Sequence, residues 1–157
     1  MLRALDKLKD TLIIFTGVNP DLNSDLISSK IDNCKKKDKF QIFNHLGKIL
    51  YLSLIKQVDC IVGNSSSGFI EAPYLKVPVV NIGKRQDGRP LSINIINTDY
   101  QKKNILKAIR KTYSFNFRKN LKFTKSFYFK RNSSLNILNF LEKKNLENIK
   151  QKKFKNE

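Results

Sequence analysis

The sequence predicts an α/β protein in which a parallel sheet is flanked by helices. Short runs rich in Val, Ile and Phe are hydrophobic throughout, as expected of parallel strands that are buried on both faces. The segments between these runs carry apolar residues at helical spacing, so that strands and helices alternate along the chain. With 157 residues, of which 40% are hydrophobic, the chain is long enough to form one domain with a sizeable core.

The individual elements follow from these patterns. Leu2, Leu5 and Leu8 recur at three-residue spacing, so we expect residues 2–10 to be the last turns of a helix. The predicted strands cover residues 11–16, 40–43, 58–62, 77–82 and 92–96. The residues expected on the inner faces of the later helices are Leu22, Leu26 and Ile31, then Leu46, Ile49, Leu50 and Leu54, then Ile105, Ala108 and Ile109. Residues 19–21, Asn-Pro-Asp, offer turn and N-cap chemistry before the first of these helices.

The region from Phe115 onward differs in character, because Lys and Arg greatly outnumber Glu and aromatic residues are interleaved with them. A helix is predicted from Leu135 to Leu141. We expect residues 1–143 to form the folded domain and residues 144–157 to be a basic, flexible tail. Aromatic rings interleaved with Lys and Arg could also bind single-stranded nucleic acid, because rings stack on bases. For residues 115–155 we favour instead a helix-packing segment with solvated lysines.

The charge balance favours anionic partners, because 31 Lys and Arg against 13 Asp and Glu give a net charge of +18. Lys, Asn and Ile are all abundant, as expected if base composition has biased the codons, so the charge alone carries little weight. Cys34 and Cys60 lie far apart, which argues against a metal site or a disulfide. The N-terminus does not resemble a signal peptide and no apolar run reaches membrane-spanning length, so we predict a cytoplasmic protein.

A loop rich in serine marks the expected ligand site. Residues 62–73 read Val-Gly-Asn-Ser-Ser-Ser-Gly-Phe-Ile-Glu-Ala-Pro and connect a predicted strand to a predicted helix. The glycines allow a tight turn, the three hydroxyls can donate to anionic oxygens, and the first N–H groups of the helix add their dipole. Glu71 would repel phosphate but suits sugar hydroxyls, as acidic residues do with ribose in nucleotide sites.

A second loop, residues 83–90, follows the next predicted strand and reads Gly-Lys-Arg-Gln-Asp-Gly-Arg-Pro. Arg85 and Arg89 are suited to clamp phosphate oxygens, and we interpret Lys84 and Asp87 as solvated loop charges. A Gly/Arg loop alone is typical of a solvated turn. A parallel sheet places successive βα loops side by side, so the serine loop and this Gly/Arg loop together predict one anion site.

Residues 63–68, 71–73 and 83–89, at this spacing, resemble the UDP-N-acetylglucosamine 2-epimerase family. Within that family they resemble the hydrolysing enzymes that make N-acetylmannosamine for sialic-acid-type pathways. The similarity runs from about Thr11 to about Tyr113. It implies a two-domain fold like that of the type B glycosyltransferases, whose C-terminal Rossmann-like domain holds most of the nucleotide. The chain resembles that C-terminal domain alone.

The resemblance also implies a role for each motif residue. Ser65 and Ser66 are expected to bind the diphosphate of UDP or of UDP-N-acetylglucosamine, assisted by backbone N–H groups near Ser67. Glu71 is expected to accept hydrogen bonds from the ribose hydroxyls, and Arg85 to neutralise diphosphate charge. No cofactor and no metal ion is implied.

Tyr51 falls where the family places an aromatic ring against the uracil, and an ordinary surface or core aromatic is the alternative at this position. His45 is the only histidine, but we do not expect it to be catalytic, because the family's functional histidine belongs to an upstream segment. Asp59 is interpreted as a turn or capping residue rather than an acid catalyst.

The reaction of the family begins with removal of the proton at C2 of the sugar and loss of UDP, which requires carboxylates of the N-terminal domain. We therefore expect the UDP-binding half of a hydrolysing epimerase, inactive alone, whose N-terminal domain lies upstream or on a separate chain. No catalytic residue is assigned within these 157 residues. The alternative is a non-catalytic or regulatory module that binds a nucleotide-sugar.

Overall fold

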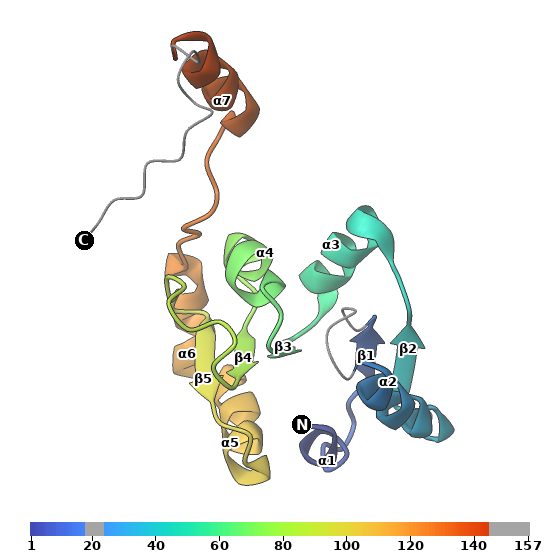
Figure 1. Ribbon diagram of the computed structural model, residues 1–157. Helices are drawn as coiled ribbons and strands as arrows, with labels where there is room; N and C mark the ends of the chain where they lie inside the picture. Colours follow the sequence, from blue (N-terminus) through green and yellow to red (C-terminus); the bar gives the residue numbers. More distant parts are fainter. Residues whose placement is uncertain (18–23, 145–157) are drawn as a thin grey trace, which may run out of the picture. The chain divides into compact units, whose positions relative to one another are not determined.

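The computed structural model describes residues 1–17 and 24–144 (Figure 1). The chain divides into two compact units, Met1–Phe127 and Tyr128–Glu157. In the first half of the larger unit the elements are α1 (Leu2–Leu5), β1 (Ile13–Thr16), α2 (Ser24–Asp32), the 3₁₀ turn η1 (Asn33–Lys36), β2 (Phe40–Phe43) and α3 (Gly47–Gln57). They are followed by β3 (Ile61–Gly63), α4 (Ser67–Leu75), β4 (Val79–Ile82), β5 (Ile95–Thr98), α5 (Lys102–Thr112), α6 (Phe115–Asn120) and the 3₁₀ turn η2 (Leu121–Phe123).

All pairing between the described strands is parallel. β1 pairs with β2, and β4 lies between β3 and β5, with Val79 opposite both Ile61 and Ile95. The described strands thus form a two-stranded and a three-stranded sheet (Figure 1). A helix lies between each pair of successive strands except β4 and β5, which are joined by a loop. This arrangement confirms the predicted fold class, a Rossmann-like α/β protein with parallel strands and flanking helices.

The central strand β4 is buried on both faces, and its side chains alternate between two hydrophobic clusters. Val80 and Ile82 belong to one cluster, and Val79 belongs to the other. The first cluster consists of Ala4, Leu5, Ile13, Phe15, Ile31, Phe40, Val80, Ile82, Ile105, Ala108 and Ile109. The second consists of Ile55, Phe69, Ala72, Val77, Val79 and Ile95. Helix α5 therefore packs on one face of β4 and contacts α1, while α4 packs on the other face and contacts α3.

The approach of α4 to β4 is close enough to require glycine at position 68. A Cβ added to Gly68 would lie 2.8 Å from Cγ1 of Val79, well inside normal contact distance. The first turn of α4 therefore lies directly on the sheet at the point where the serine loop ends.

The predicted strand over residues 92–96 is wrong in position, because β5 begins at Ile95. The Ile95 N–H donates to the Ser92 carbonyl at 3.1 Å and closes a turn there. Asn94 is fully buried, and its side-chain amide donates to the Val77 carbonyl at 2.7 Å. The apolar pattern of Ile93, Ile95 and Ile96 conceals this turn, which depends on a long-range hydrogen bond that no local pattern reveals.

Most other predicted elements are confirmed, some of them with different bounds. Residues 40–43 form β2, α5 buries Ile105, Ala108 and Ile109, and the strand predicted over 58–62 begins only at Ile61. The helix predicted over residues 2–10 ends at Leu5 and is followed by turns. Ile31 is buried as predicted, whereas residues 19–22 and the side chain of Leu26 lie outside the described residues.

The predicted inner face of α3 is wrong. Ile49 and Leu50 are 81% and 63% exposed, whereas Ile55 is only 3% exposed and joins the second hydrophobic cluster. Leu46 and Leu54 are half-buried. Apolar residues surround much of this helix, so their spacing did not select one face, and the packing of α3 on α4 made the choice.

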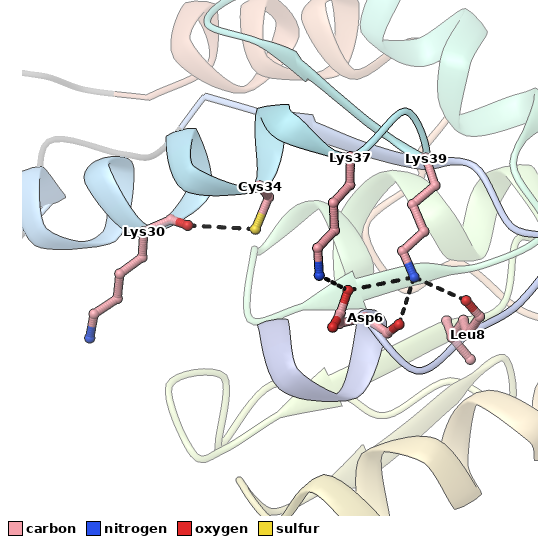
Figure 2. A network of polar contacts seen from close by, with 6 residues as sticks. All are labelled: Asp6, Leu8, Lys30, Cys34, Lys37 and Lys39. Carbon is pink, nitrogen blue, oxygen red and sulfur yellow. Dashed lines mark hydrogen bonds and ion pairs between the residues drawn. The ribbon is translucent and has the colours of Figure 1, made fainter.

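A polar network ties the end of α1 to the start of β2 (Figure 2). The Asp6 carboxylate lies 2.6 Å from the Lys37 ammonium and 3.8 Å from that of Lys39. Lys39 also donates to the Asp6 and Leu8 carbonyls at 2.7 and 3.0 Å, and beside this cluster the Cys34 thiol donates to the Lys30 carbonyl at 3.5 Å.

The hydrogen bond from Lys37 lowers the pKa of the Asp6 carboxyl below its ordinary value. A lowered pKa means that the folded state favours the charged form. The contribution of Asp6 to stability is therefore present at neutral pH and is lost as the pH falls through the lowered pKa. Because the pair is solvent-exposed, the effect is small.

The C-terminal part of the larger unit contains α6, a helix that the sequence analysis did not anticipate. Its N-cap is Ser114, whose hydroxyl accepts a hydrogen bond from the Phe117 N–H at 3.4 Å. The aromatic rings here contact the chain's own cations: Arg118 lies 5.1 Å from the Tyr113 ring centroid, and Lys122 lies 4.9 Å from that of Phe123. These intramolecular contacts offer an explanation for the interleaved pattern that does not involve nucleic acid.

The smaller unit contains α7 (Ser133–Glu142), which confirms the helix predicted from Leu135 to Leu141. All of its described residues, 128–144, are exposed. The predicted boundary between residues 143 and 144 stays a prediction, since residues 145–157 lie outside the described part. No helix within residues 1–17 or 24–144 is both long enough and apolar enough to cross a bilayer.

Truncating a buried side chain of α5 is expected to destabilise the fold. Ile105 has no exposed surface, so Ile105→Ala should lower the free energy of unfolding by about 2–5 kcal/mol through lost burial and a cavity. The matched change Ile49→Ala, at an exposed helical position, should alter it by no more than about 0.5 kcal/mol. Urea unfolding followed by circular dichroism measures both, and equal effects would contradict the assignment of the core.

Candidate nucleotide site

The serine loop leads from the end of β3 into α4, and its own side chains shape the start of the helix. The Ser65 hydroxyl accepts a hydrogen bond from the Ser67 N–H at 3.3 Å, and the Ser65 carbonyl accepts one from the Gly68 N–H at 3.2 Å. Ser66 stands at the N-cap of α4, but its hydroxyl makes no capping hydrogen bond to that helix. The loop thus brings two successive serines to the positive end of a nine-residue helix.

The Gly/Arg loop follows β4 and folds into two successive turns. The Asp87 N–H donates to the Lys84 carbonyl at 3.0 Å, and the Arg89 N–H donates to the Gln86 carbonyl at 3.2 Å. Gly88 has a φ of +83°, a left-handed conformation that favours glycine. The side chains of Lys84 and Asp87 are exposed, in agreement with their interpretation as solvated loop charges, and Arg85 is exposed as well.

The structure brings the two loops together. Since β3 and β4 pair in parallel, with Gly63 opposite Asn81, both loops leave the same edge of the sheet. Gln86 joins them directly, because its side-chain amide Nε2 donates to the Asn64 carbonyl at 2.9 Å. Gln86 is only 6% exposed, although its sequence neighbours are charged and exposed. The sequence analysis missed it, since a glutamine between charged loop residues carries no signal of burial.

Several buried oxygen atoms at this site have no hydrogen-bond partner among the described residues. They are Ser67 Oγ and Glu71 Oε2 on α4, and Gln86 Oε1 in the Gly/Arg loop. Buried polar atoms are nearly always paired, so each of these oxygens can take a hydrogen bond from water or from a ligand. Asn94, Thr124 and Ser126 carry similar atoms elsewhere in the described chain.

A small cavity of about 120 Å³ lies under the Gly/Arg loop, at the carboxyl ends of β4 and β5. Its lining residues are Phe69, Asn81, Gln86, Asp87, Gly88, Arg89, Leu91 and Asn97. The buried Asn81 amide donates to Asn97 Oδ1 at 3.0 Å across the two paired strands. Arg89, one of the two arginines suited to clamp phosphate, lines this cavity. The residues that the family resemblance assigns to UDP are not among its described lining residues, namely Tyr51, Ser65, Ser66, Ser67, Glu71 and Arg85.

The remaining candidate residues lie on other elements. Tyr51 is a half-buried residue of α3 that packs against the second hydrophobic cluster, and α3 contacts α4. His45 is exposed just before α3. Asp59 precedes β3, where the Arg118 guanidinium donates to its backbone carbonyl at 3.1 Å and lies 3.7 Å from its carboxylate. Among the described residues, no group of three or more His, Cys, Asp or Glu side chains is placed to hold a metal ion.

Cys60 is the residue directly before β3, close in sequence to the serine loop. Burial raises the pKa of its thiol to about 11, an effect that the hydrogen bond from Thr112 only partly offsets. Since the thiolate is the nucleophilic form, Cys60 is almost wholly inert at neutral pH. It is a packing residue rather than a nucleophile.

The fold and the two loops define a Rossmann-like α/β domain with an anion-suited sheet edge. A family model described as UDP-N-acetylglucosamine 2-epimerase matches residues 1–142. The chain therefore belongs to the UDP-N-acetylglucosamine 2-epimerase family, as the paired motifs of the sequence predicted.

Individual relatives agree with this membership. The GDP/UDP-N,N'-diacetylbacillosamine 2-epimerase (hydrolyzing) of Campylobacter jejuni is 41% identical over 122 residues, which are 76% of this chain and 31% of that protein. The polysialic acid biosynthesis protein P7 of Escherichia coli is 35% identical over 92% of this chain and 38% of its own length. The UDP-N-acetylglucosamine 2-epimerase of Neisseria meningitidis is 42% identical over half of this chain. The chain thus spans about a third of the length of the first two relatives.

The inertness of Cys60 is open to a direct test. At pH 7.5 we expect iodoacetamide to leave Cys60 largely unmodified in the folded chain, because a thiol with a pKa of about 11 is almost fully protonated. In urea both Cys34 and Cys60 should react, which serves as the control. Peptide mass spectrometry locates the label, and rapid modification of folded Cys60 would contradict this assignment.

Proposed function

We propose that residues 1–142 bind the UDP moiety of a UDP-sugar within a hydrolysing 2-epimerase. The observation that carries the proposal is the position of the serine loop, which stands at the N-terminus of α4 and is joined to the Gly/Arg loop by the hydrogen bond from Gln86 to Asn64. The buried Glu71 Oε2 atom on α4 has no partner among the described residues. A ligand rich in hydroxyl donors and anionic oxygens fits such a site. The printed names of the relatives, which include UDP- and GDP/UDP-sugar 2-epimerases, support the same ligand class.

In this proposal the diphosphate lies at the N-terminus of α4. The hydroxyls of Ser65 and Ser66 donate to its oxygens, and the helix dipole and N–H groups near Ser67 favour its negative charge. Arg85, from the neighbouring loop, adds a positive charge that binds phosphate oxygens through more than one N–H group.

The nucleoside is held by residues of α4 and α3. Glu71 stands on α4, and its Oε2 atom, which has no described partner, accepts from a ribose hydroxyl. Tyr51 stacks on the uracil, which its place on the neighbouring helix α3 permits. Because one relative is named for both GDP and UDP substrates, the choice of base is part of the proposal and is included in its test.

The chemistry of a hydrolysing 2-epimerase is loss of UDP from the sugar followed by addition of water. A general base must remove the proton at C2, and a carboxylate suits this role. In the proposal Glu71 is committed to ribose, and the base comes from the N-terminal domain outside residues 1–142, as the resemblance to the family implies. The chain alone then binds the leaving group without releasing it from the substrate.

Removal of single ligand groups is expected to weaken UDP binding. Ser65→Ala and Glu71→Ala should each raise the dissociation constant of UDP about 10-fold or more, since hydrogen bonds to charged groups contribute about 1.5–3 kcal/mol. Ser53→Ala on the exposed surface of α3, and Glu142→Ala in α7, are matched controls that should bind like the parent. Isothermal titration calorimetry gives the constants.

The same titrations decide against the proposal in two cases. A parent chain that binds neither UDP nor GDP removes the nucleotide site altogether. Normal UDP binding by both Ser65→Ala and Glu71→Ala would move the ligand elsewhere on the chain. Stronger binding of GDP than of UDP would change the proposed base from uracil to guanine.

Turnover by the isolated 157-residue chain is expected to be absent. Incubated with UDP-N-acetylglucosamine, it should release no UDP and form no N-acetylmannosamine, both of which chromatography detects. Product formation above a no-enzyme blank would overturn the claim that the base lies elsewhere. If the chain binds UDP and turnover is not restored when the rest of the protein is added, the non-catalytic module is favoured.

A further inference from the structure

Gln86 combines burial, a specific hydrogen bond and a position between two loops. Its side chain lies beneath an otherwise exposed loop and is only 6% exposed. The Nε2 group donates to the Asn64 carbonyl at 2.9 Å, across 22 residues of sequence. Asn64 directly precedes Ser65, so the hydrogen bond acts on the backbone that carries the serines.

The other contacts of Gln86 hold its own loop. Its backbone carbonyl accepts from the Arg89 N–H at 3.2 Å and closes the second turn of the Gly/Arg loop. The side chain also lines the cavity beneath that loop, together with Phe69 of α4. Gln86 therefore contacts both the Gly/Arg loop and the serine loop, and it lines the same cavity as Phe69 of α4.

The charged neighbours of Gln86 do not offer this contact. Lys84, Arg85 and Asp87 are exposed, whereas the neutral carboxamide of Gln86 can be buried at lower cost. The Asn64 carbonyl requires a donor, which a carboxylate lacks. A residue of this length with a neutral N–H donor fits both requirements.

We infer that Gln86 is a positioning residue that fixes the serine loop against the Gly/Arg loop and so aligns Ser65 and Ser66 with Arg85 around one diphosphate. The inference rests on the proposed function, because it assigns the diphosphate to these loops. Gln86 does not contact the diphosphate itself. It orders the loops before the ligand arrives, and so reduces the entropy that binding must overcome.

The test compares a ligand that has the diphosphate with one that lacks it. In Gln86→Met, which keeps the length of the side chain but loses the N–H donor, the dissociation constant of UDP should rise about 3- to 10-fold, as expected for one net hydrogen bond. That of uridine should stay unchanged. NMR titration measures both ligands, including millimolar affinities. Gln41→Met, at an exposed glutamine of β2, is the matched control and should change neither constant.

Each result separates the inference from the proposed function. If the parent chain binds no UDP, the proposed function fails first. If the parent binds UDP and Gln86→Met binds it equally well, only the positioning role is overturned. An equal loss for UDP and uridine would make Gln86 a general structural residue. Should Gln86→Met fail to fold by circular dichroism, Gln86→Glu keeps the shape, lacks the donor at neutral pH and is held to the same comparison.

Discussion

The parallel pairing of β3 with β4 is the constraint on which the rest of the site depends. Strands that run in the same direction bring their following loops to one edge, and here the register places Gly63 opposite Asn81. The central strand β4 is stable in this position because apolar side chains cover both of its faces. The serine and Gly/Arg loops are separated in sequence by α4 and β4, and the sheet brings them to one edge, where Gln86 bridges them.

Near that edge, buried oxygens of Ser67, Glu71 and Gln86 have no hydrogen-bond partner among the described residues. Under the proposed function a nucleotide supplies the missing donors to some of these atoms, so binding and folding stabilise each other. The net charge of +18 adds a general attraction for such a ligand but does not locate it. Under the proposed function, a few hydrogen bonds determine where the ligand binds.

The sequence was sufficient where local chemistry determines structure. Continuous apolar runs gave the strands, and glycine and serine after β3 indicated the loop, because these features act over a few residues. It failed where a distant partner decides. The exposed Ile49 and the buried Ile55 of α3 are equally apolar, and only packing on α4 distinguishes them. The start of β5 depends on the bond from Asn94 to Val77, and the burial of Gln86 depends on Asn64.

The contact between Gly68 and Val79 limits how this site can change over evolutionary time. Because a methyl group at position 68 would meet Cγ1 of Val79 at 2.8 Å, a larger residue there requires a smaller one at position 79. Val79 in turn lies opposite Ile61 and Ile95, so shrinking it opens a gap between three strands. We therefore expect residues 68 and 79 to vary together across the family, and such covariation would record how closely α4 must approach the sheet.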